Sequence, residues 1–163
     1  NSAYTIDYAD LYRKGYRGVI FDIDNTLVPH GAPATKEAAA FFASLRETGF
    51  STCLLSNNQK PRVAPFADAV GSIYIENAHK PSVKNYQEAC RRMGIKEEQA
   101  VFVGDQLFTD VYGAKRTGLY NILTEPINPK EEIQIVLKRY LEHIVLFFYE
   151  RDLARGRITK KNS

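Results

Sequence analysis

Sulfur and tryptophan are scarce in this sequence, which has two cysteines, one methionine and no tryptophan in 163 residues. Cys53 and Cys90 are too few for the disulfide framework of a small secreted domain, and we expect two buried thiols in a reducing cytoplasm. The longest apolar run, over 144–149, has six residues, whereas a membrane-spanning helix needs about 20. The first 15 residues also lack the apolar segment of a signal peptide. These absences favour a cytoplasmic protein.

A strong charge of one sign is missing from most of the chain, whose formal net charge is +3. Residues 138–163 contain seven lysines and arginines against three acidic residues, so the other 137 residues together carry a charge of −1. The basic excess predicts an interaction tail over 151–163. Nucleic-acid binding is not expected, because no basic stripe runs along the rest of the chain.

Short apolar runs alternate with segments of helical period. Strands are expected at 18–24, 51–57, 72–78, 100–105 and 120–124, and helices at 35–49, 62–71, 81–94, 109–118 and about 129–149. Thr35 is the expected N-cap of the first helix, Gly49 ends it, and Pro81 opens the third helix. This alternation predicts a Rossmann-like three-layer α/β/α fold with a mainly parallel sheet. The length suits a single domain over 1–163, with its core at about 15–150.

Polar residues lie at or just beyond the end of each of the first four predicted strands. In chain order they are Asp22 and Asp24, then Ser56, Asn57 and Asn58, then Lys80, and finally Gly104 and Asp105 with Asp110 five residues further on. The carboxyl ends of parallel strands lie at one edge of a sheet, where such folds bind their ligands. We therefore expect these side chains to converge on a single site.

The chemistry of this set points to phosphate. Close carboxylates repel one another, which raises their pKa values unless a cation lies between them. Oxygen ligands suit Mg²⁺, and Ser56 and Lys80 supply a neutral donor and a cation for phosphate oxygens. Each feature is common by itself, since a DxD pair, a capping serine or a Gly-Asp turn occurs on many surfaces. Together and in this order they predict a phosphoryl-transfer site that uses Mg²⁺.

Four motifs carry a family resemblance over residues 18–124. "DIDNT", "SNN", "HKP" and "GDQLFTD" resemble the haloacid dehalogenase (HAD) superfamily of aspartate-nucleophile phosphatases. "DIDNTLVPHG" and "GDQLFTDVYGAKRTG" are similar to the small bacterial phosphatases of its subfamily III-A, which are related to phosphatidylglycerophosphate phosphatases. The resemblance implies a HAD-like fold and a Mg²⁺-dependent phosphomonoester hydrolase. An acid at position 24 favours a phosphatase over a dehalogenase.

The resemblance also implies a role for each motif residue. Asp22 is the nucleophile that takes the phosphoryl group as an aspartyl phosphate and is a metal ligand. Asp24 protonates the leaving oxygen and then activates water, and its backbone carbonyl is a further metal ligand. Asp105 binds Mg²⁺ directly, and Asp110 binds it directly or through water, or holds Lys80. Ser56, the backbone amide of Asn57 and Lys80 bind the phosphate. Thr26 fixes the turn after the first strand. Asn58 and Gly104 have supporting roles.

The spacing between motifs leaves no room for a cap domain. Only 34 residues separate Asp22 from Ser56, and 24 separate Ser56 from Lys80. We therefore expect an open site for a bulky substrate, such as a macromolecule or a membrane-lipid phosphate like phosphatidylglycerophosphate. A small sugar phosphate or nucleotide is the alternative substrate. Lys60 and Arg62 are candidates for binding a second anionic group.

Three further features leave alternatives open. Either the last predicted helix packs on the sheet and the basic tail is solvated, or both segments contact the inner face of an anionic membrane. His30, His79 and His143 are expected to be solvated rather than catalytic. The non-enzyme alternative is a phosphate-binding scaffold or a receiver-like signalling domain, although a receiver carries its acceptor aspartate on a later strand. A calcium loop is disfavoured, because Leu27 stands where such a loop needs glycine.

Overall fold

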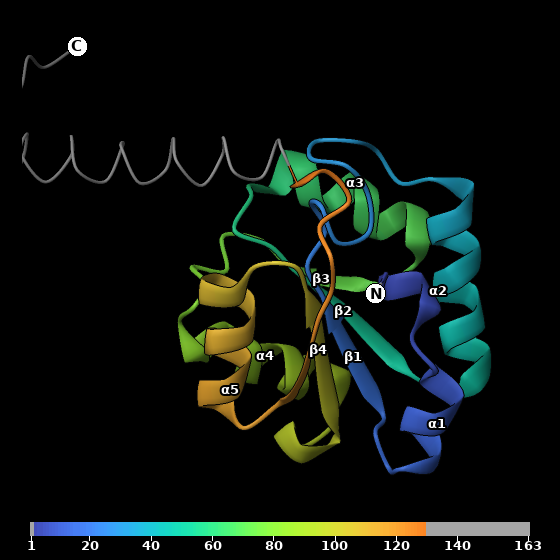
Figure 1. Ribbon diagram of the computed structural model, residues 1–163, viewed down its shortest axis with the longest axis vertical. Coiled ribbons are helices and arrows are strands. Elements are labelled where there is room, and N and C mark those ends of the chain that lie inside the picture. The colour runs from blue at the N-terminus through green and yellow to red at the C-terminus, as the bar shows by residue number, and fades with distance from the viewer. Residues whose placement is uncertain (1, 130–163) are drawn as a thin grey trace, which may run out of the picture. The chain divides into compact units, whose positions relative to one another are not determined.

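Figure 1 shows the computed structural model of the chain, in which residues 2–129 are described. The elements in chain order are η1 (Ala3–Thr5), α1 (Tyr8–Arg13), β1 (Gly18–Phe21), α2 (Lys36–Thr48), β2 (Ser51–Leu55), α3 (Lys60–Val70), β3 (Ile73–Ile75), α4 (Val83–Met93), η2 (Glu97–Gln99), β4 (Ala100–Gly104), η3 (Leu107–Val111), α5 (Tyr112–Thr117) and β5 (Tyr120–Leu123). The chain divides into two units, Asn1–Asn128 and Pro129–Ser163, and all these elements belong to the first. The predicted helix to residue 149 and the tail over 151–163 lie outside the described residues, so the single domain over 1–163 stays a prediction.

The five strands form one sheet in the order β3-β2-β1-β4-β5, and every pair is parallel. Gly18, the first residue of β1, pairs with Ser51 of β2 and with Ala100 of β4. This register aligns the carboxyl ends of the three central strands. The predicted Rossmann-like fold is confirmed, and the sheet is parallel throughout.

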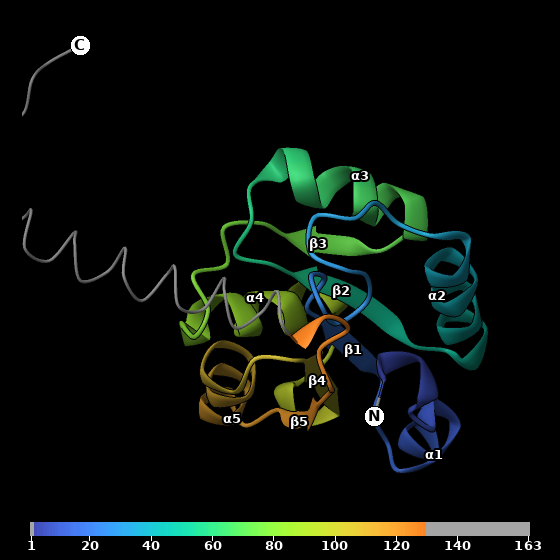
Figure 2. The same cartoon turned by 45° about the horizontal axis from the view of Figure 1, so that its top comes forward.

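Helices cover both faces of the sheet, with α1, α2 and α3 on one side and α4 and α5 on the other (Figures 1 and 2). Alternate residues of β1 face opposite layers, because side chains alternate along a strand. Val19 and Phe21 pack in one apolar cluster with Phe42 of α2, whereas Ile20 packs in the other with Tyr86 of α4. Both predicted thiols, Cys53 and Cys90, are buried and free.

The ends of the first predicted helix are confirmed. The Thr35 hydroxyl accepts a hydrogen bond from the Ala38 amide at 3.0 Å. Gly49 ends α2 in the left-handed conformation with φ 103°, which glycine adopts without steric cost. The chain then enters β2 two residues later.

Other predicted boundaries are wrong. Pro81 does not open the third predicted helix, because α4 begins at Val83 and the Lys80–Pro81 peptide bond is cis. Helix α3 begins at Lys60, so Pro61 lies in its first turn and Pro65 inside it; a proline in the first turn costs no backbone hydrogen bond. The predicted helix over 109–118 is a π-helix, η3, followed by α5.

The core begins earlier than the predicted residue 15. Ala3, Tyr8 and Leu11 are buried in the same apolar cluster as β1. Their elements, η1 and α1, have three and six residues, too few to show a hydrophobic period. Among the described residues, none of the helices has the length and apolar character needed to cross a bilayer.

Within residues 22–80, all of which the structure describes, no cap domain interrupts the core. Between Asp22 and Ser56 the chain forms α2 and β2, and between Ser56 and Lys80 it forms α3 and β3. All four elements belong to the three layers of the fold.

Candidate active site

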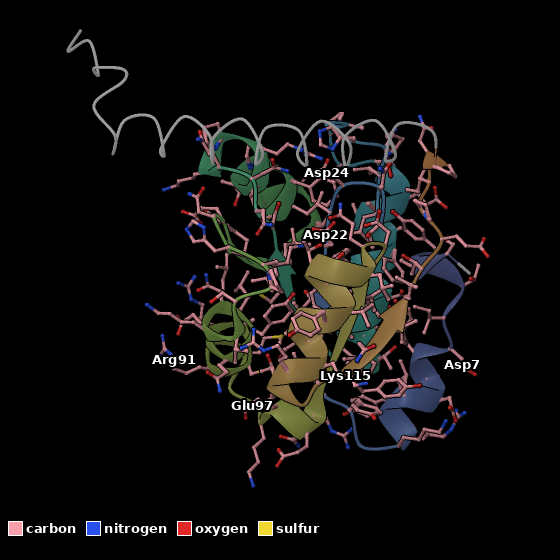
Figure 3. The ribbon with its side chains drawn as sticks, turned by 60° about the vertical axis from the view of Figure 1, so that its left-hand side comes forward. Asp7, Asp22, Asp24, Arg91, Glu97 and Lys115 are labelled. Carbon is pink, nitrogen blue, oxygen red and sulfur yellow. The ribbon has the colours of Figure 1, made fainter. Side chains whose placement is uncertain are left out.

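The predicted site residues gather at the carboxyl edge of the sheet. Asp22 follows β1 directly, Ser56 follows β2 and Asp105 follows β4, and all three are buried. The strands are shorter than predicted, so these polar residues come just after the last paired residue of each strand. Asp22 and Asp24 both lie in the upper half of the described part of the chain in the view of Figure 3.

Lys80 is the cation at the centre of the site. Its Nζ donates to Asp22 Oδ1 at 2.6 Å and to Asp110 Oδ1 at 2.7 Å. Burial lowers the pKa of Lys80, but Asp110 and Asp22 more than offset this effect and hold the pKa above its usual range. The ammonium group therefore stays charged while it neutralises part of the acidic cluster.

Three carboxylates form that cluster. Oxygen atoms of Asp22, Asp105 and Asp110 all lie within 4.8 Å of one another, and all three residues are buried. Burial raises the pKa of Asp22 to about 7; Lys80 opposes this rise, whereas Asp110 and Asp24 add to it. The donors are hard oxygens, which fit Mg²⁺ better than a soft metal.

Gly104 lets Asp110 approach the end of β4. A Cβ atom at position 104 would collide with the Asp110 carboxylate. The second oxygen of that carboxylate, Oδ2, accepts a hydrogen bond from the Gln106 amide at 3.1 Å. The predicted supporting glycine thus leaves room for one of the acids, while the loop fixes the orientation of that acid.

Thr26 makes a contact other than the predicted one. Its hydroxyl donates to Asp105 Oδ1 at 3.0 Å, across 79 residues of sequence. It therefore links the turn after β1 to the loop after β4, rather than only fixing its own turn. Asn25 adopts a φ of 61° in that turn, and its backbone amide donates a hydrogen bond to the Val28 carbonyl.

Asp24 accepts hydrogen bonds from three donors of its own. The Gly31 amide donates to Oδ1 at 2.8 Å, and the Arg62 guanidinium donates to the same oxygen at 2.9 Å. Asn58 Nδ2 donates to Oδ2 at 2.6 Å. The sequence predicted a supporting role for Asn58, but it did not predict the contacts of Gly31 and Arg62 with Asp24.

The residues after β2 connect two parts of the site. The backbone amide of Asn58 donates a hydrogen bond to Ser56 Oγ at 3.1 Å. Asn57 instead fixes the loop that carries Lys80, since its Oδ1 accepts from the Lys80 amide at 2.7 Å. Asn57 therefore has a positioning contact in addition to its predicted role through the backbone.

The remaining candidates are exposed or lie outside the described residues. His30, His79 and Lys60 are exposed, and His143 is not among the described residues. The sequence did not predict the contact that Tyr86 makes with η3. Tyr86 is buried, and its hydroxyl group donates a hydrogen bond to the Thr109 carbonyl at 2.8 Å. A tyrosine on a predicted helix carries no signal for such a contact.

The parallel sheet with acids at its carboxyl edge defines an α/β protein whose site suits phosphate chemistry, and comparison with known proteins gives the family. The profile of the haloacid dehalogenase-like hydrolases matches residues 31–118. The chain is 35% identical to the probable phosphatase YqeG of Bacillus subtilis (strain 168), over 86% of this chain and 83% of that protein. The chain belongs to the haloacid dehalogenase-like hydrolases and is a phosphatase of phosphoric monoesters, so the receiver-like alternative is wrong.

Two further comparisons bear on the substrate and on the fold. The chain is 29% identical to the phosphatidylglycerophosphate phosphatase 1, chloroplastic/mitochondrial, of Arabidopsis thaliana, over 93% of this chain. It spans 46% of that protein, less than half of its length. A crystal structure of an uncharacterized protein from Corynebacterium glutamicum superposes with a TM-score of 0.56 at 22% identity, covering 75% of this chain and 93% of that one. That likeness supports the fold alone.

Proposed function

We propose that this phosphatase works through an aspartyl-phosphate intermediate on Asp22 and requires Mg²⁺. The observation that carries the proposal is the ion pair between Lys80 and Asp22 within the cluster of Asp22, Asp105 and Asp110. Three buried acids around one ammonium group leave an excess of negative charge, which a divalent cation offsets. Asp22, Asp105, Asp110 and the backbone carbonyl of Asp24 are the proposed ligands. When bound, the cation supplies charge neutralisation for the phosphate and for the acids.

In the first step an oxygen of Asp22 attacks phosphorus, and the bond from phosphorus to the leaving oxygen breaks. Asp24 gives its proton to that oxygen, so the leaving group departs as an alcohol. Lys80, Ser56 and the Asn57 amide bind the phosphate oxygens and keep the attack in line. Lys80 is suited to this because it remains charged while buried.

In the second step water attacks the phosphorus of the aspartyl phosphate. Asp24, now a carboxylate, takes the proton from that water, and the Asp22 carboxylate is released together with inorganic phosphate. One carboxyl group thus gives a proton and then recovers one. The donors that hold Asp24 differ from the ammonium group that holds Asp22 and Asp110, which is consistent with this separate role.

We also propose a membrane-lipid phosphate, such as phosphatidylglycerophosphate, as the substrate. The named activity of the Arabidopsis relative and the absence of a cap between the core elements support this choice. The basic residues of 151–163 would favour an anionic membrane surface, with the protein at its inner face. A higher kcat/KM for a sugar phosphate or nucleotide would favour the soluble-metabolite alternative.

The test is hydrolysis of an aryl phosphate with Mg²⁺ by the wild type and by Asp22→Asn. We expect the substitution to abolish turnover, because an amide oxygen is a far weaker nucleophile than a carboxylate. Asp68→Asn is the matched control, since it removes an exposed acid on α3. Undiminished turnover by Asp22→Asn would refute the assignment of the nucleophile.

A further inference from the structure

Arg62 forms an ion pair with the proposed acid and base, Asp24. Its side chain lies on the first turn of α3 and is 21% exposed, against 10% for its partner Asp24. The Nε atom of Arg62 is buried and has no hydrogen-bond partner among the described residues. A guanidinium has five N–H donors in a fixed plane, so Arg62 can hold Asp24 and still bind a further acceptor.

A groove of about 330 Å³ begins beside these residues. Gly31 and Arg62, which both donate to Asp24 Oδ1, line it. The rest of its lining is largely apolar and includes Pro33, Ala34, Pro65 and Phe66. The loop from β1 to α2 runs alongside α3 in Figure 2, and the groove lies between these two segments.

The Arg62 side chain is fixed from two sides within this groove. Its guanidinium lies 5.5 Å from the centre of the Phe66 ring, within the range of a cation–π contact. Its other contact is the ion pair with Asp24. A side chain fixed in this way has already lost part of its conformational entropy, so it binds a ligand at a lower cost than a mobile surface arginine.

The proposed chemistry places the leaving group beside Asp24, where the groove begins. Asp24 must reach the leaving oxygen to protonate it, so the remainder of the leaving group extends from Asp24. The groove starts at two of the three residues that donate hydrogen bonds to Asp24, namely Gly31 and Arg62. Among the described residues that line it, the one charged residue is a cation, Arg62, while its walls suit carbon atoms.

We propose that this groove is the leaving-group subsite and that Arg62 binds a second phosphate carried by the leaving group. The ligand class is a polyol headgroup with a monoester phosphate at one end and a phosphodiester to a lipid a few bonds away. Arginine suits this role because its planar donors match two phosphate oxygens. The inference rests on the proposed function, and it makes Arg62 a determinant of substrate specificity.

Lys60, the other residue predicted to bind a second anionic group, provides a comparison on the same helix. It lies two residues before Arg62, is exposed, and forms no ion pair with any described residue. Residues two apart on a helix do not share a face. Lys60→Gln therefore removes one positive charge from α3 without removing the donor beside Asp24.

The test compares kcat/KM for three substrates: phenyl phosphate, deacylated phosphatidylglycerophosphate, and the intact lipid in detergent micelles. Only the last two carry a second phosphate. We expect Arg62→Gln to lower the ratio of kcat/KM for each of them to that for phenyl phosphate by about 10- to 100-fold, the usual effect of losing a charged hydrogen bond. The glutamine side chain of this variant still has an amide that can donate to Asp24, so the ratio separates binding of the second phosphate from positioning of Asp24.

Three results would overturn the inference. The first is an unchanged ratio in Arg62→Gln, which would leave Arg62 only with the positioning of Asp24. The second is an equal fall in Lys60→Gln, which would show general charge attraction. The third is a fall confined to the intact lipid, which would assign the effect to the acyl part.

Failure of the proposed function gives a different result, namely phenyl phosphate hydrolysis that does not depend on Asp22. Calorimetric binding of the deacylated substrate to Asp22→Asn, with and without Arg62→Gln, then tests the second-phosphate contact by itself. An affinity that falls in the double variant supports the inference, and an equal affinity overturns it.

Discussion

The ammonium group of Lys80 lies 2.6 Å from a carboxylate oxygen of Asp22, and both residues are buried. The same group lies 2.7 Å from Asp110. One cation thus joins the end of β1 to η3, and it partly neutralises acids that burial alone would disfavour. This pairing explains how the carboxyl edge of the sheet holds its acids together without a metal ion.

Lys80→Met tests the structural part of this pairing. The substitution keeps a long side chain but leaves Asp22 and Asp110 buried without their cation, which costs roughly 3–5 kcal/mol when a buried pair is broken. We expect urea unfolding to show such a loss in chelator and a partial recovery in Mg²⁺. Lys84→Met, at an exposed lysine of α4, should change little; an equally small effect at position 80 would contradict the pairing.

The raised pKa of Asp22 predicts an unusual pH dependence of stability. The unfolded chain releases this proton near 3.8, whereas the folded protein holds it up to about 7. Native Asp22 therefore binds more protons between these values, so its contribution to stability is fully present at low pH and is lost as pH rises to about 7. Above that pH the contribution no longer changes.

Melting temperatures in chelator measure this effect. We expect the Tm of Asp22→Asn relative to wild type to be higher at about pH 8 than at about pH 5, because asparagine has no proton to lose. A difference that does not vary with pH would contradict the assignment. Asp68→Asn, at an exposed position, serves as the control.

Thr26→Val tests whether the contact with Asp105 supports a metal ligand. Valine has nearly the volume of threonine but cannot donate to Asp105 Oδ1, and loss of such a supporting hydrogen bond typically costs about 10- to 100-fold in metal affinity. Calorimetric titration with Mg²⁺ measures the change. Thr124→Val is a matched control, because the Thr124 hydroxyl is buried with no hydrogen-bond partner among the described residues. Equal Mg²⁺ affinities in the two variants would contradict the role of Thr26.

The basic residues of 151–163 lead to a separate prediction about membranes. We expect the full chain to sediment with anionic vesicles, to lose this binding in high salt, and to lose it when 151–163 are deleted, because each basic residue near such a surface contributes about 1 kcal/mol. Binding to neutral vesicles as strong as binding to anionic ones would argue against an electrostatic contact.

The strand-end residues could be predicted from the sequence because a parallel sheet leaves few options. Once β1, β2 and β4 are recognised, their carboxyl ends must lie at one edge, which places Asp22, Ser56 and Asp105 together. The order of these residues along the chain then distinguishes the site from that of a receiver domain. The exact ends of the strands were less important than their order.

The contacts between loops could not be predicted in this way. Arg62 reaches Asp24 across 38 residues, and Thr26 reaches Asp105 across 79. Both contacts depend on the turn after β1, which Asn25 holds with a positive φ, and no periodic pattern encodes that turn. Helix α1 was not predicted for a related reason. Its six residues are too few to show a hydrophobic period, and their packing on the core determines their position.

The most direct measurement is intact-protein and peptide mass spectrometry of Asp24→Asn quenched during turnover of an aryl phosphate in Mg²⁺. Asparagine cannot activate water for the second step, so the covalent intermediate should accumulate. We predict a mass increase of one phosphoryl group that maps to Asp22 and is absent from the double variant Asp22→Asn/Asp24→Asn. Turnover without this adduct, or an adduct on another residue, would contradict an aspartyl-phosphate mechanism on Asp22.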